Sequence, residues 1–417
     1  MDHDLHRRRF MEATASSLLG VSILPSLGRP LTAAPVGKAK RLIYLFMQGA
    51  MSHIDTLDPK PGSDSQGPTG TIKTKIPGVQ FGQHLPKLAG MAQRLAIVRS
   101  LNTATGAHGP GQYLMRTSYK KIATTRHPSL GPWLQKRLGR IHKELPPSVQ
   151  VGGGVGPGYL GAQFAPVPIG DPNKGLQNTK QPSYLLDGQF DQRMNLAAKF
   201  DKTFRSRASS AEVAGYDDLY REAIGLLNSK DLAAFDLSKE PQAKQDKYGT
   251  SRFGRGCLLA ARLIEHGVRY VEVTHNSWDH HRDLASDNNI PGKCANLDDG
   301  LSSLLTDLQS RGLLDETLIV VATEFGRKPK INQNAGRDHH PAAFSCLLAG
   351  AGIKAGQVFG KTDKDGFYVD DNDVTVQDFN ATIASALGIA LDEEIYSPDG
   401  RPFTIADDGE AIKSLLS

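Results

Sequence analysis

The sequence predicts an α/β fold built on a mostly parallel β-sheet. Short continuous apolar runs recur along its 417 residues, and each run is followed by polar or glycine-rich sequence. Such runs are typical of strands that are buried on both faces of a parallel sheet. Amphipathic helical patterns lie between the runs, as expected where strands and helices alternate. The length suits one large domain or two ordinary ones.

The elements follow from these patterns in chain order. Apolar runs predict strands at 41–47, 95–98, 268–273, 318–322 and 344–349. Leucine and alanine recur at helical spacing at 248–266 and 295–311, which predicts two helices. A segment at 152–245 is rich in Gly, Pro, Asn, Gln and Lys, with a helical stretch at 216–227. Because long irregular connections are uncommon and often functional, we expect this segment to be a cap-like insertion.

The N-terminus has the features of an export leader. Arginines at 7–9 precede an apolar run at 13–27, which is shorter than the roughly 20 residues needed to span a bilayer. The pattern resembles a twin-arginine leader, so residues 1–34 are predicted to be a signal peptide and residues 35–417 a single domain. The alternative is an amphipathic helix of a cytoplasmic protein. We therefore expect export by the twin-arginine machinery, a periplasmic or extracellular location, and no permanent membrane anchor.

Composition excludes several classes of function. The formal net charge is only +5, and the sequence lacks the concentrated stripe of Lys and Arg that nucleic-acid-binding proteins normally carry. The three cysteines, Cys257, Cys294 and Cys346, have no C-x-x-C spacing, and their number is odd. These observations argue against nucleic acid as the main partner and exclude a disulfide scaffold and a thiolate zinc site.

Histidines gather directly after the predicted strands. Of 13 histidines, seven lie in such loops, namely His53, His108, His275, His280, His281, His339 and His340. Ligands of parallel α/β sheets bind outside the carboxyl ends of the strands. Mixed His, Asp and Glu ligation without cysteine is the chemistry of zinc, manganese or iron. One such loop alone is more often a hydrogen-bonded turn, but four of them favour a shared metal or catalytic centre if their strands are neighbours. Glu324 is either a ligand or the partner of Arg327.

Several longer motifs together resemble a known family. They are Arg-Arg-x-Phe near the start, Gly-x-x-Ser-His-Ile-Asp-Thr-Leu-Asp-Pro-Lys-Pro at 49–61, Trp-Asp-His-His at 278–281, Glu-Phe-Gly-Arg at 324–327, Gly-Arg-Asp-His at 336–339 and Thr-Asp-Lys-Asp-Gly at 362–366. The sequence is similar, from about Arg7 to Phe403, to a family of exported bacterial proteins catalogued as a domain of unknown function. That family is placed in the alkaline phosphatase and sulfatase superfamily. The resemblance implies a three-layer α/β/α sandwich around a mostly parallel sheet.

The resemblance also implies a set of metal ligands. Asp55 is similar in position to the aspartate after the first strand of the superfamily, although His53 competes for that role. Asp279 and His281 resemble an aspartate and a histidine of a later loop. Superfamily members have an Asp-His pair after the next strand, and this sequence has Glu324-Phe325 there, so the carboxylate is kept and the imidazole is lost. The implied ligands are Asp55, Asp279, His281, Glu324 and His339, around zinc, with manganese, calcium or iron as alternatives.

His108 occupies the position of the superfamily nucleophile, at the start of the helix after the second strand. Pro110 suits a first helical residue, so His108 is expected just before the helix. It could carry a covalent intermediate, act as general acid or base, or bind a metal or an anion; the alternative is a structural role at the helix start. Arg327 is the second predicted catalytic residue.

The function implied is that of an exported, metal-dependent hydrolase of phosphate or sulfate esters. Its expected partner is an anionic ester substrate, such as a sulfated or phosphorylated glycan. The alternative is a non-catalytic, metal-containing binding protein for extracellular glycans or a protein partner.

Overall fold

A computed structural model describes residues 37–177 and 229–417. Seven residues between these two ranges are also described: Thr179, Gln189, Gln192, Leu196, Lys199, Gly225 and Leu226. The predicted leader at 1–34 lies outside the described residues. So does the helical stretch predicted at 216–227, except for Gly225 and Leu226.

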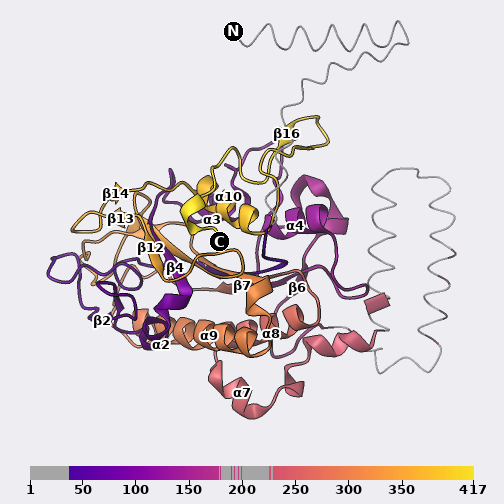
Figure 1. The fold of residues 1–417 in the computed structure, drawn as a ribbon, viewed down its shortest axis with the longest axis horizontal. Helices are drawn as coiled ribbons and strands as arrows, with labels where there is room; N and C mark the ends of the chain where they lie inside the picture. Colours follow the sequence, from indigo (N-terminus) through magenta and orange to yellow (C-terminus); the bar gives the residue numbers. More distant parts are fainter. Residues whose placement is uncertain are drawn as a thin grey trace, which may run out of the picture. The chain divides into compact units, whose positions relative to one another are not determined.

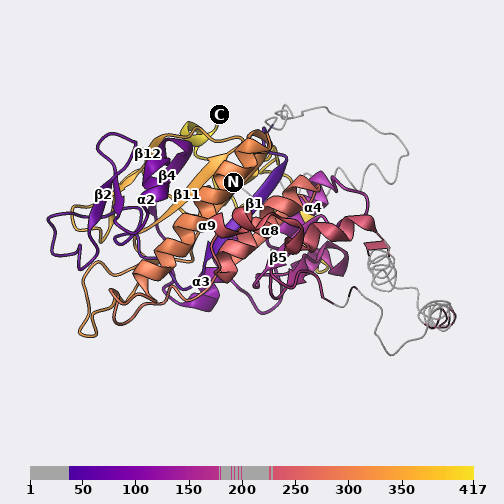
Figure 2. The ribbon, with the colours of Figure 1, turned by 90° about the horizontal axis from the view of Figure 1, so that it is seen from below.

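An eight-stranded sheet forms the centre, in the order β12-β4-β11-β8-β1-β7-β5-β6 (Figures 1 and 2). Its strands are β1 (Arg41–Met47), β4 (Leu95–Leu101), β5 (Ser148–Val151), β6 (Val167–Ile169), β7 (Tyr270–His275), β8 (Thr317–Ala322), β11 (Phe344–Gly350) and β12 (Gln357–Phe359). Every neighbouring pair is parallel except the two that β11 makes with β4 and β8. The predicted α/β fold with a mostly parallel sheet is confirmed.

The strand at 344–349 differs from the prediction in its direction. It was expected to be parallel, but β11 runs antiparallel to both of its neighbours. A parallel neighbour requires a long crossover, usually through a helix. No α-helix lies between β8 and β11, where the chain instead forms the short strands β9 (Gly326–Arg327) and β10 (His339–His340). The chain therefore returns along the sheet in the opposite direction.

Helices cover both faces of the sheet. Figure 1 shows α3 (His108–Thr117), α4 (Leu130–Leu138) and α10 (Val376–Ala386) on one face, and α8 (Arg252–Glu265) and α9 (Ile290–Ser310) on the other. Successive side chains of a strand point to opposite faces. In β1, Leu42, Tyr44 and Phe46 accordingly join one hydrophobic core, and Ile43, Leu45 and Met47 join the other. This is the three-layer arrangement that was expected.

The predicted helices at 248–266 and 295–311 correspond to α8 and α9. Shorter elements complete the described chain: α2 (Pro86–Gly90), α7 (Gln242–Lys247), and the strand pairs β2 (Thr71–Lys73) with β3 (Gln80–Gly82), β13 (Lys361–Thr362) with β14 (Val369–Asp371), and β15 (Ile395–Tyr396) with β16 (Pro402–Phe403). One-turn 3₁₀ helices lie at Ala92–Arg94, Gly158–Leu160, Ala162–Phe164, Leu237–Lys239, Leu314–Glu316 and Lys413–Leu415, and a longer one at Lys230–Phe235.

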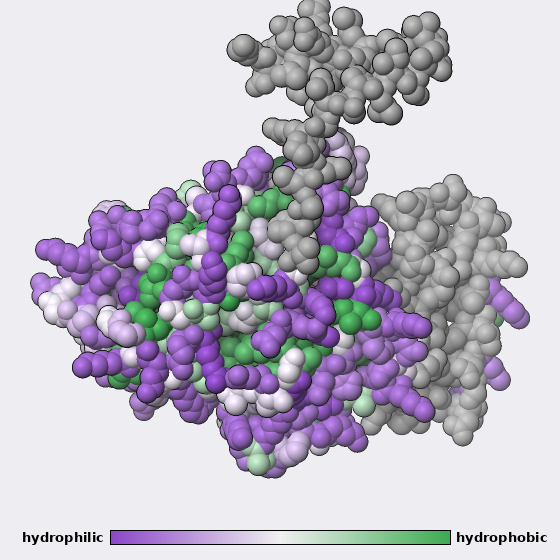
Figure 3. All heavy atoms as spheres, viewed as in Figure 1, coloured by the Kyte–Doolittle hydropathy of each residue, from purple (hydrophilic) through white to green (hydrophobic). Residues whose placement is uncertain are grey.

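The segment predicted as a cap-like insertion, 152–245, contributes to the central sheet. Its strand β6 pairs in parallel with β5 and forms one edge of the sheet. Among the described residues, no helix combines the length and the apolar character needed to cross a membrane. The face of the molecule seen in Figure 3 is mainly hydrophilic, with hydrophobic residues showing between the polar ones.

Candidate metal centre

The loops that carry the predicted site residues meet at one edge of the sheet. Strands β1, β4, β7 and β8 run in the same direction, and β1 lies directly between β7 and β8. The carboxyl ends of these strands, and the loops that follow them, therefore lie at the same edge. The expected shared site required neighbouring strands: β7, β1 and β8 are direct neighbours, and β4 is separated from β8 by β11.

Three histidines surround Asp279 at this edge. The Nε2 atom of His281 lies 3.1 Å, and that of His339 3.2 Å, from Oδ1 of Asp279. The Nε2 atom of His108 lies 3.3 Å from Oδ2 of the same carboxylate. The Nε2 atoms of His281 and His339 are 3.0 Å apart. We call His108, Asp279, His281 and His339 the His-Asp cluster.

Each of the three imidazoles is held from behind by an acceptor. The contacts of their Nδ1 atoms are His108 to Glu324 Oε1 at 2.8 Å, His281 to Asp338 Oδ1 at 3.2 Å, and His339 to the carbonyl oxygen of Gly106 at 2.7 Å. A carbonyl oxygen or an ionised carboxylate only accepts hydrogen bonds, and Nε2 of each ring also faces such an acceptor, Asp279. The Nδ1 contacts of His108 and His339 are the shorter ones, so the proton of these two rings, when neutral, is assigned to Nδ1 and their Nε2 lone pairs face Asp279. Nε2 of His281 also lies 3.4 Å from Nη1 of Arg327. Metal-binding histidines have the same outer hydrogen bond.

These lone pairs need a positive partner. Burial and the charge of Arg327 lower the pKa of His339, so its ring is mainly neutral near pH 7. Burial raises the pKa of Asp279, but the hydrogen bond and charge of Arg327 outweigh it and the net pKa is well below the usual range. Tetrahedral zinc sites with bonds of about 2.0–2.1 Å place their nitrogen and oxygen ligands about 3.3–3.4 Å apart. The ligand atoms of His108, Asp279 and His339 lie within 4.8 Å of one another, a grouping that could hold a metal ion, and Nε2 of His281 lies beside them at 3.1 Å from Asp279.

His108 differs from the other two histidines in its protonation. Its pKa is raised, first by the hydrogen bond to Glu324. A proton on Nε2 would face Asp279, so protonation competes with metal binding at this residue. The helix α3 also begins at His108 and not at Pro110, because the carbonyl of Ala107 accepts the first helical bond from Gly111. Proline is tolerated within that first turn.

Arg327 was predicted to be catalytic, and it lies buried behind the cluster. Its guanidinium group donates to Asp279 and to the carbonyl oxygens of Gly49, Ala50 and Arg337, and its Nη1 also lies 3.4 Å from Nε2 of His281. Its position comes from the pairing of β9 with β10, which sets Arg327 opposite His339. With its donors used inside the protein, Arg327 fixes the orientation of Asp279.

Glu324 lies one step outside the cluster. Its Oε1 atom accepts hydrogen bonds from Nδ1 of His108, from the amide of Gly49 at 2.9 Å and from Nε2 of Gln112 at 3.2 Å. The sequence left two roles open for Glu324, a metal ligand or the partner of Arg327. In the structure Arg327 pairs with Asp279, and Glu324 pairs with His108. Burial raises the pKa of Glu324, but these hydrogen bonds, led by that of His108, lower it overall.

Asp55 and His53 do not belong to the cluster. Arg337 holds both carboxylate oxygens of Asp55, at 2.7 Å and 3.2 Å, and Ser52 and Thr69 each donate to it at 2.6 Å. All of these groups are buried. Nε2 of His53 donates to the carbonyl oxygen of Gly366 at 2.9 Å, and burial lowers the pKa of His53 to about 4. Asp55 is thus the carboxylate of a buried ion pair with Arg337.

A glycine brings two of the loops into contact. Gly49 follows β1 with φ of +113°, and a Cβ atom there would lie 2.6 Å from the amide nitrogen of Asp279. Only glycine adopts this conformation without strain and leaves room for the neighbouring backbone. The sequence motif at 49–61 contained this residue, but the reason for the glycine became visible only in the structure.

Comparison with known sequences identifies the family. The family described as "Protein of unknown function (DUF1501)" matches residues 39–416. The chain belongs to this family. A comparison with curated proteins gave no match.

Solved structures similar to this DUF1501 chain have low sequence identity. A phosphonate monoester hydrolase of Agrobacterium radiobacter is 12% identical, with 90% of this chain and 77% of that chain covered and a TM-score of 0.41. A protein in the alkaline phosphatase superfamily from Vibrio parahaemolyticus is 12% identical, covering 92% and 72%, with a TM-score of 0.41. The lipoteichoic acid synthase LtaP from Listeria monocytogenes is 10% identical, covering 97% and 82%, with a TM-score of 0.40. Similarity at this level says nothing about the activity of the DUF1501 chain.

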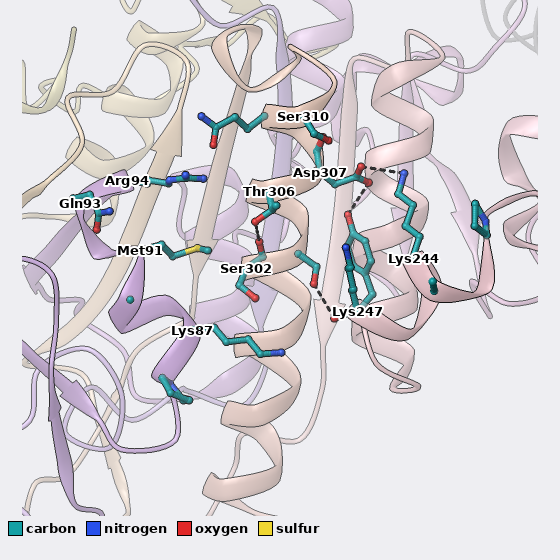
Figure 4. Close-up of a pocket in the computed structure, with 17 residues that line it drawn as sticks. Lys87, Met91, Gln93, Arg94, Lys244, Lys247, Ser302, Thr306, Asp307 and Ser310 are labelled. Atoms are coloured by element: carbon teal, nitrogen blue, oxygen red, sulfur yellow. Dashed lines mark hydrogen bonds and ion pairs between the residues drawn. The ribbon is translucent and has the colours of Figure 1, made fainter.

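A large cavity of the DUF1501 chain lies away from the cluster. It has a volume of about 990 Å³ and is lined by residues of α2, α7 and α9 (Figure 4). Its acidic residue, Asp307, is paired with Lys244 at 3.0 Å and accepts from the hydroxyl of Tyr248 at 3.1 Å. None of the cluster residues lines this cavity, so its size does not make it the candidate site.

Proposed function

We propose that this protein is an exported, metal-dependent hydrolase of phosphate or sulfate esters. One observation carries the proposal: three imidazole Nε2 atoms face the carboxylate of Asp279, and all three Nδ1 atoms are held by acceptors. Asp279 and His281 lie in the loop after β7, His108 begins the helix after β4, and His339 lies in β10 on the segment after β8, so all four are near the carboxyl ends of parallel strands, where α/β proteins bind their ligands.

The donor set limits the choice of metal. His108, His281 and His339 offer nitrogen, and Asp279 offers oxygen. Zinc, iron and manganese accept such mixed sets, whereas calcium prefers oxygen ligands alone. Calcium is therefore the least suitable of the cations expected from the sequence. A divalent cation supplies Lewis-acid polarisation of an ester oxygen.

The protein side chains prepare the site for an anionic group. The cluster side chains are 27–44% exposed, so an ester can reach them from solvent. Arg327 and Glu324 hold Asp279 and His108 in place. The N-terminus of α3 lies at His108, where the helix dipole favours negative charge on a transferring group.

A non-catalytic metal-binding protein is the second candidate. Within the described part of the chain, no serine, threonine or cysteine hydrogen-bonds to a cluster side chain, so no hydroxyl or thiol nucleophile is aligned there. The three cysteines are buried, and burial raises their thiol pKa, in Cys346 to about 12. Binding of glycans without turnover remains the competing role.

Metal analysis combined with a substrate panel tests the proposal. The mature protein is expected to bind a divalent cation and to hydrolyse aryl phosphate or aryl sulfate esters. His339→Ala should lose both metal and activity. His340→Ala is the matched control, because the adjacent imidazole bonds to the carbonyl of Phe367 and lies outside the cluster. Bound metal without turnover of any ester would favour the binding protein. A His339→Ala variant with full metal content would contradict the site.

The export route rests on residues 1–34, which lie outside the described residues. We propose that they form a twin-arginine leader and that the protein acts in the periplasm or outside the cell, on an anionic ester such as that of a sulfated or phosphorylated glycan. Replacing Arg7 and Arg8 with lysine should retain the precursor in the cytoplasm. Unchanged export of this variant would exclude the twin-arginine route.

A further inference from the structure

A second cavity lies beside the cluster along α3. It has a volume of about 450 Å³, and its lining is formed by Gln48, by Lys121 and by residues of α3 and of the loop after β5. Gln112 links it to the cluster, because it lines the cavity and also donates to Glu324, the partner of His108. The size is within the range of small-molecule sites.

The charged side chains that line this cavity are cations, Arg116 and Lys121. The carboxylate of Glu272, which does not line it, pairs with Arg116 at 2.6 Å and offsets that charge. Lys121 is exposed and forms no ion pair with any residue that the structure describes. The amides of Gly153 and Gly154, also at the cavity, donate no hydrogen bond within the described chain. The groups around this space are therefore donors suited to an anion.

Arg116 is built into the protein with one side left open. Its side chain is 4% exposed, its Nε donates to Glu272 at 2.6 Å, and its guanidinium lies 3.6 Å from the ring centre of Phe46. Nη2 lies 3.5 Å from the hydroxyl of Thr274. Nη1 makes no hydrogen bond within the described residues, although Arg116 lines the cavity. A fixed guanidinium with a free edge is suited to a phosphate, sulfate or carboxylate.

The cavity and the cluster are separate places on one helix. His108 and Arg116 are eight residues apart in α3, which corresponds to about 12 Å along the helix axis. Long side chains of a helix lean toward its N-terminus, so Arg116 reaches back toward His108. An anion held at Arg116 would thus be a neighbour of an ester at the cluster and not the ester itself.

We propose that the Arg116 cavity binds a second anionic group of the substrate, so that the preferred substrate carries two anionic groups on one small scaffold. The proposal rests on the proposed function for the first group, which would lie at the His-Asp cluster. Sulfate, phosphate and carboxylate share the chemistry that Arg116 and Lys121 recognise.

Non-hydrolysable probes separate the two sites. Binding of butylphosphonate and of butane-1,4-bisphosphonate to the metal-loaded mature protein would be measured by calorimetry, with propane and hexane spacers to vary the separation. At least one bisphosphonate is expected to bind tenfold or more tightly than the single phosphonate. Lys121→Glu should weaken that bisphosphonate by roughly five- to tenfold, the effect of reversing one charge about 7 Å away in water. Lys120→Glu is the matched control, because Lys120 does not line the cavity.

A second variant removes the buried cation. Arg116→Gln combined with Glu272→Gln leaves no unpaired buried charge, which a single change would. It should abolish the advantage of the bisphosphonate while metal content stays unchanged. Repeating the binding measurements with the corresponding dicarboxylates and disulfonates shows which anion the cavity binds best.

The outcomes distinguish this inference from the proposed function. If Lys121→Glu and Lys120→Glu bind the bisphosphonates equally, or if no spacer gives an advantage, the second anion site is wrong whether or not the protein hydrolyses esters. If His339→Ala leaves binding of butylphosphonate unchanged while Lys121→Glu still weakens the bisphosphonate, the cavity binds anions and the proposed metal site fails.

Discussion

Replacing Asp55 with alanine is expected to destabilise the fold and to leave the metal content unchanged. The side chain of Arg337 is fully buried, and Asp55 holds it through two contacts of 2.7 Å and 3.2 Å. Removing one partner of a buried ion pair costs about 3–5 kcal/mol. Arg337 also donates to the carbonyl oxygens of Ser65 and Gln66, so we expect the free energy of unfolding to fall by about 3 kcal/mol.

The measurement is urea unfolding followed by tryptophan fluorescence, together with metal analysis of the folded protein. Asp55→Asn keeps the shape and the oxygen acceptor, and should lose about 1–2 kcal/mol. The double change Asp55→Leu with Arg337→Met removes both charges and should be more stable than Asp55→Ala alone. The reasoning is refuted if Asp55→Ala unfolds like the parent protein but has lost its metal, since Asp55 would then act as a ligand.

Three further changes test the cluster and its surroundings. Glu324→Gln should weaken metal binding by about 10- to 100-fold in chelator competition, because it weakens the support of His108; an unchanged affinity would argue against ligation by His108. Gly49→Ala should disturb the loop of Asp279 and lower both the thermal unfolding temperature and the metal content. If both equal those of the parent protein, the loop can shift freely. The pKa of His53 is about 4 in the folded protein against 6.5 for a free histidine. The unfolded chain therefore binds more protons between these values, and the free energy of unfolding should fall by up to about 3 kcal/mol as the pH drops from 6.5 to 4. His53→Gln should make the free energy of unfolding depend less steeply on pH, and a slope equal to that of the parent protein would contradict the low pKa of His53.

The strands and the edge that carries the site could be predicted from the sequence. Apolar runs of four to seven residues become buried strands because both faces of the sheet are covered by helices. Because ligands bind at the carboxyl ends of parallel strands, the sequence also predicted that His108, Asp279, His281 and His339 lie close together. The direction of β11 could not be read from its apolar run, because buried strands of either direction have the same pattern.

The choice of side-chain partners could not be predicted. Position after a strand does not show whether a carboxylate faces a metal or a buried arginine, and Asp55 and Glu324 were assigned on position alone. The outer partners of the histidines were missed as well. Asp338 lies inside the Gly-Arg-Asp-His motif and could have been noticed, whereas Gly106 acts through its backbone carbonyl, which leaves no signal in the sequence.

The place of β1 has a consequence for how the chain is made. β1 comes first in the chain among the strands that the structure describes, yet its neighbours β7 and β8 pair with it through Tyr270 and Leu318, far later in the chain. The nascent chain must therefore keep the apolar segment 41–47 unpaired while most of the protein is synthesised, a state in which aggregation competes with folding. His339 follows both of these strands in the chain, so the His-Asp cluster can assemble only after β7 and β8 have been synthesised.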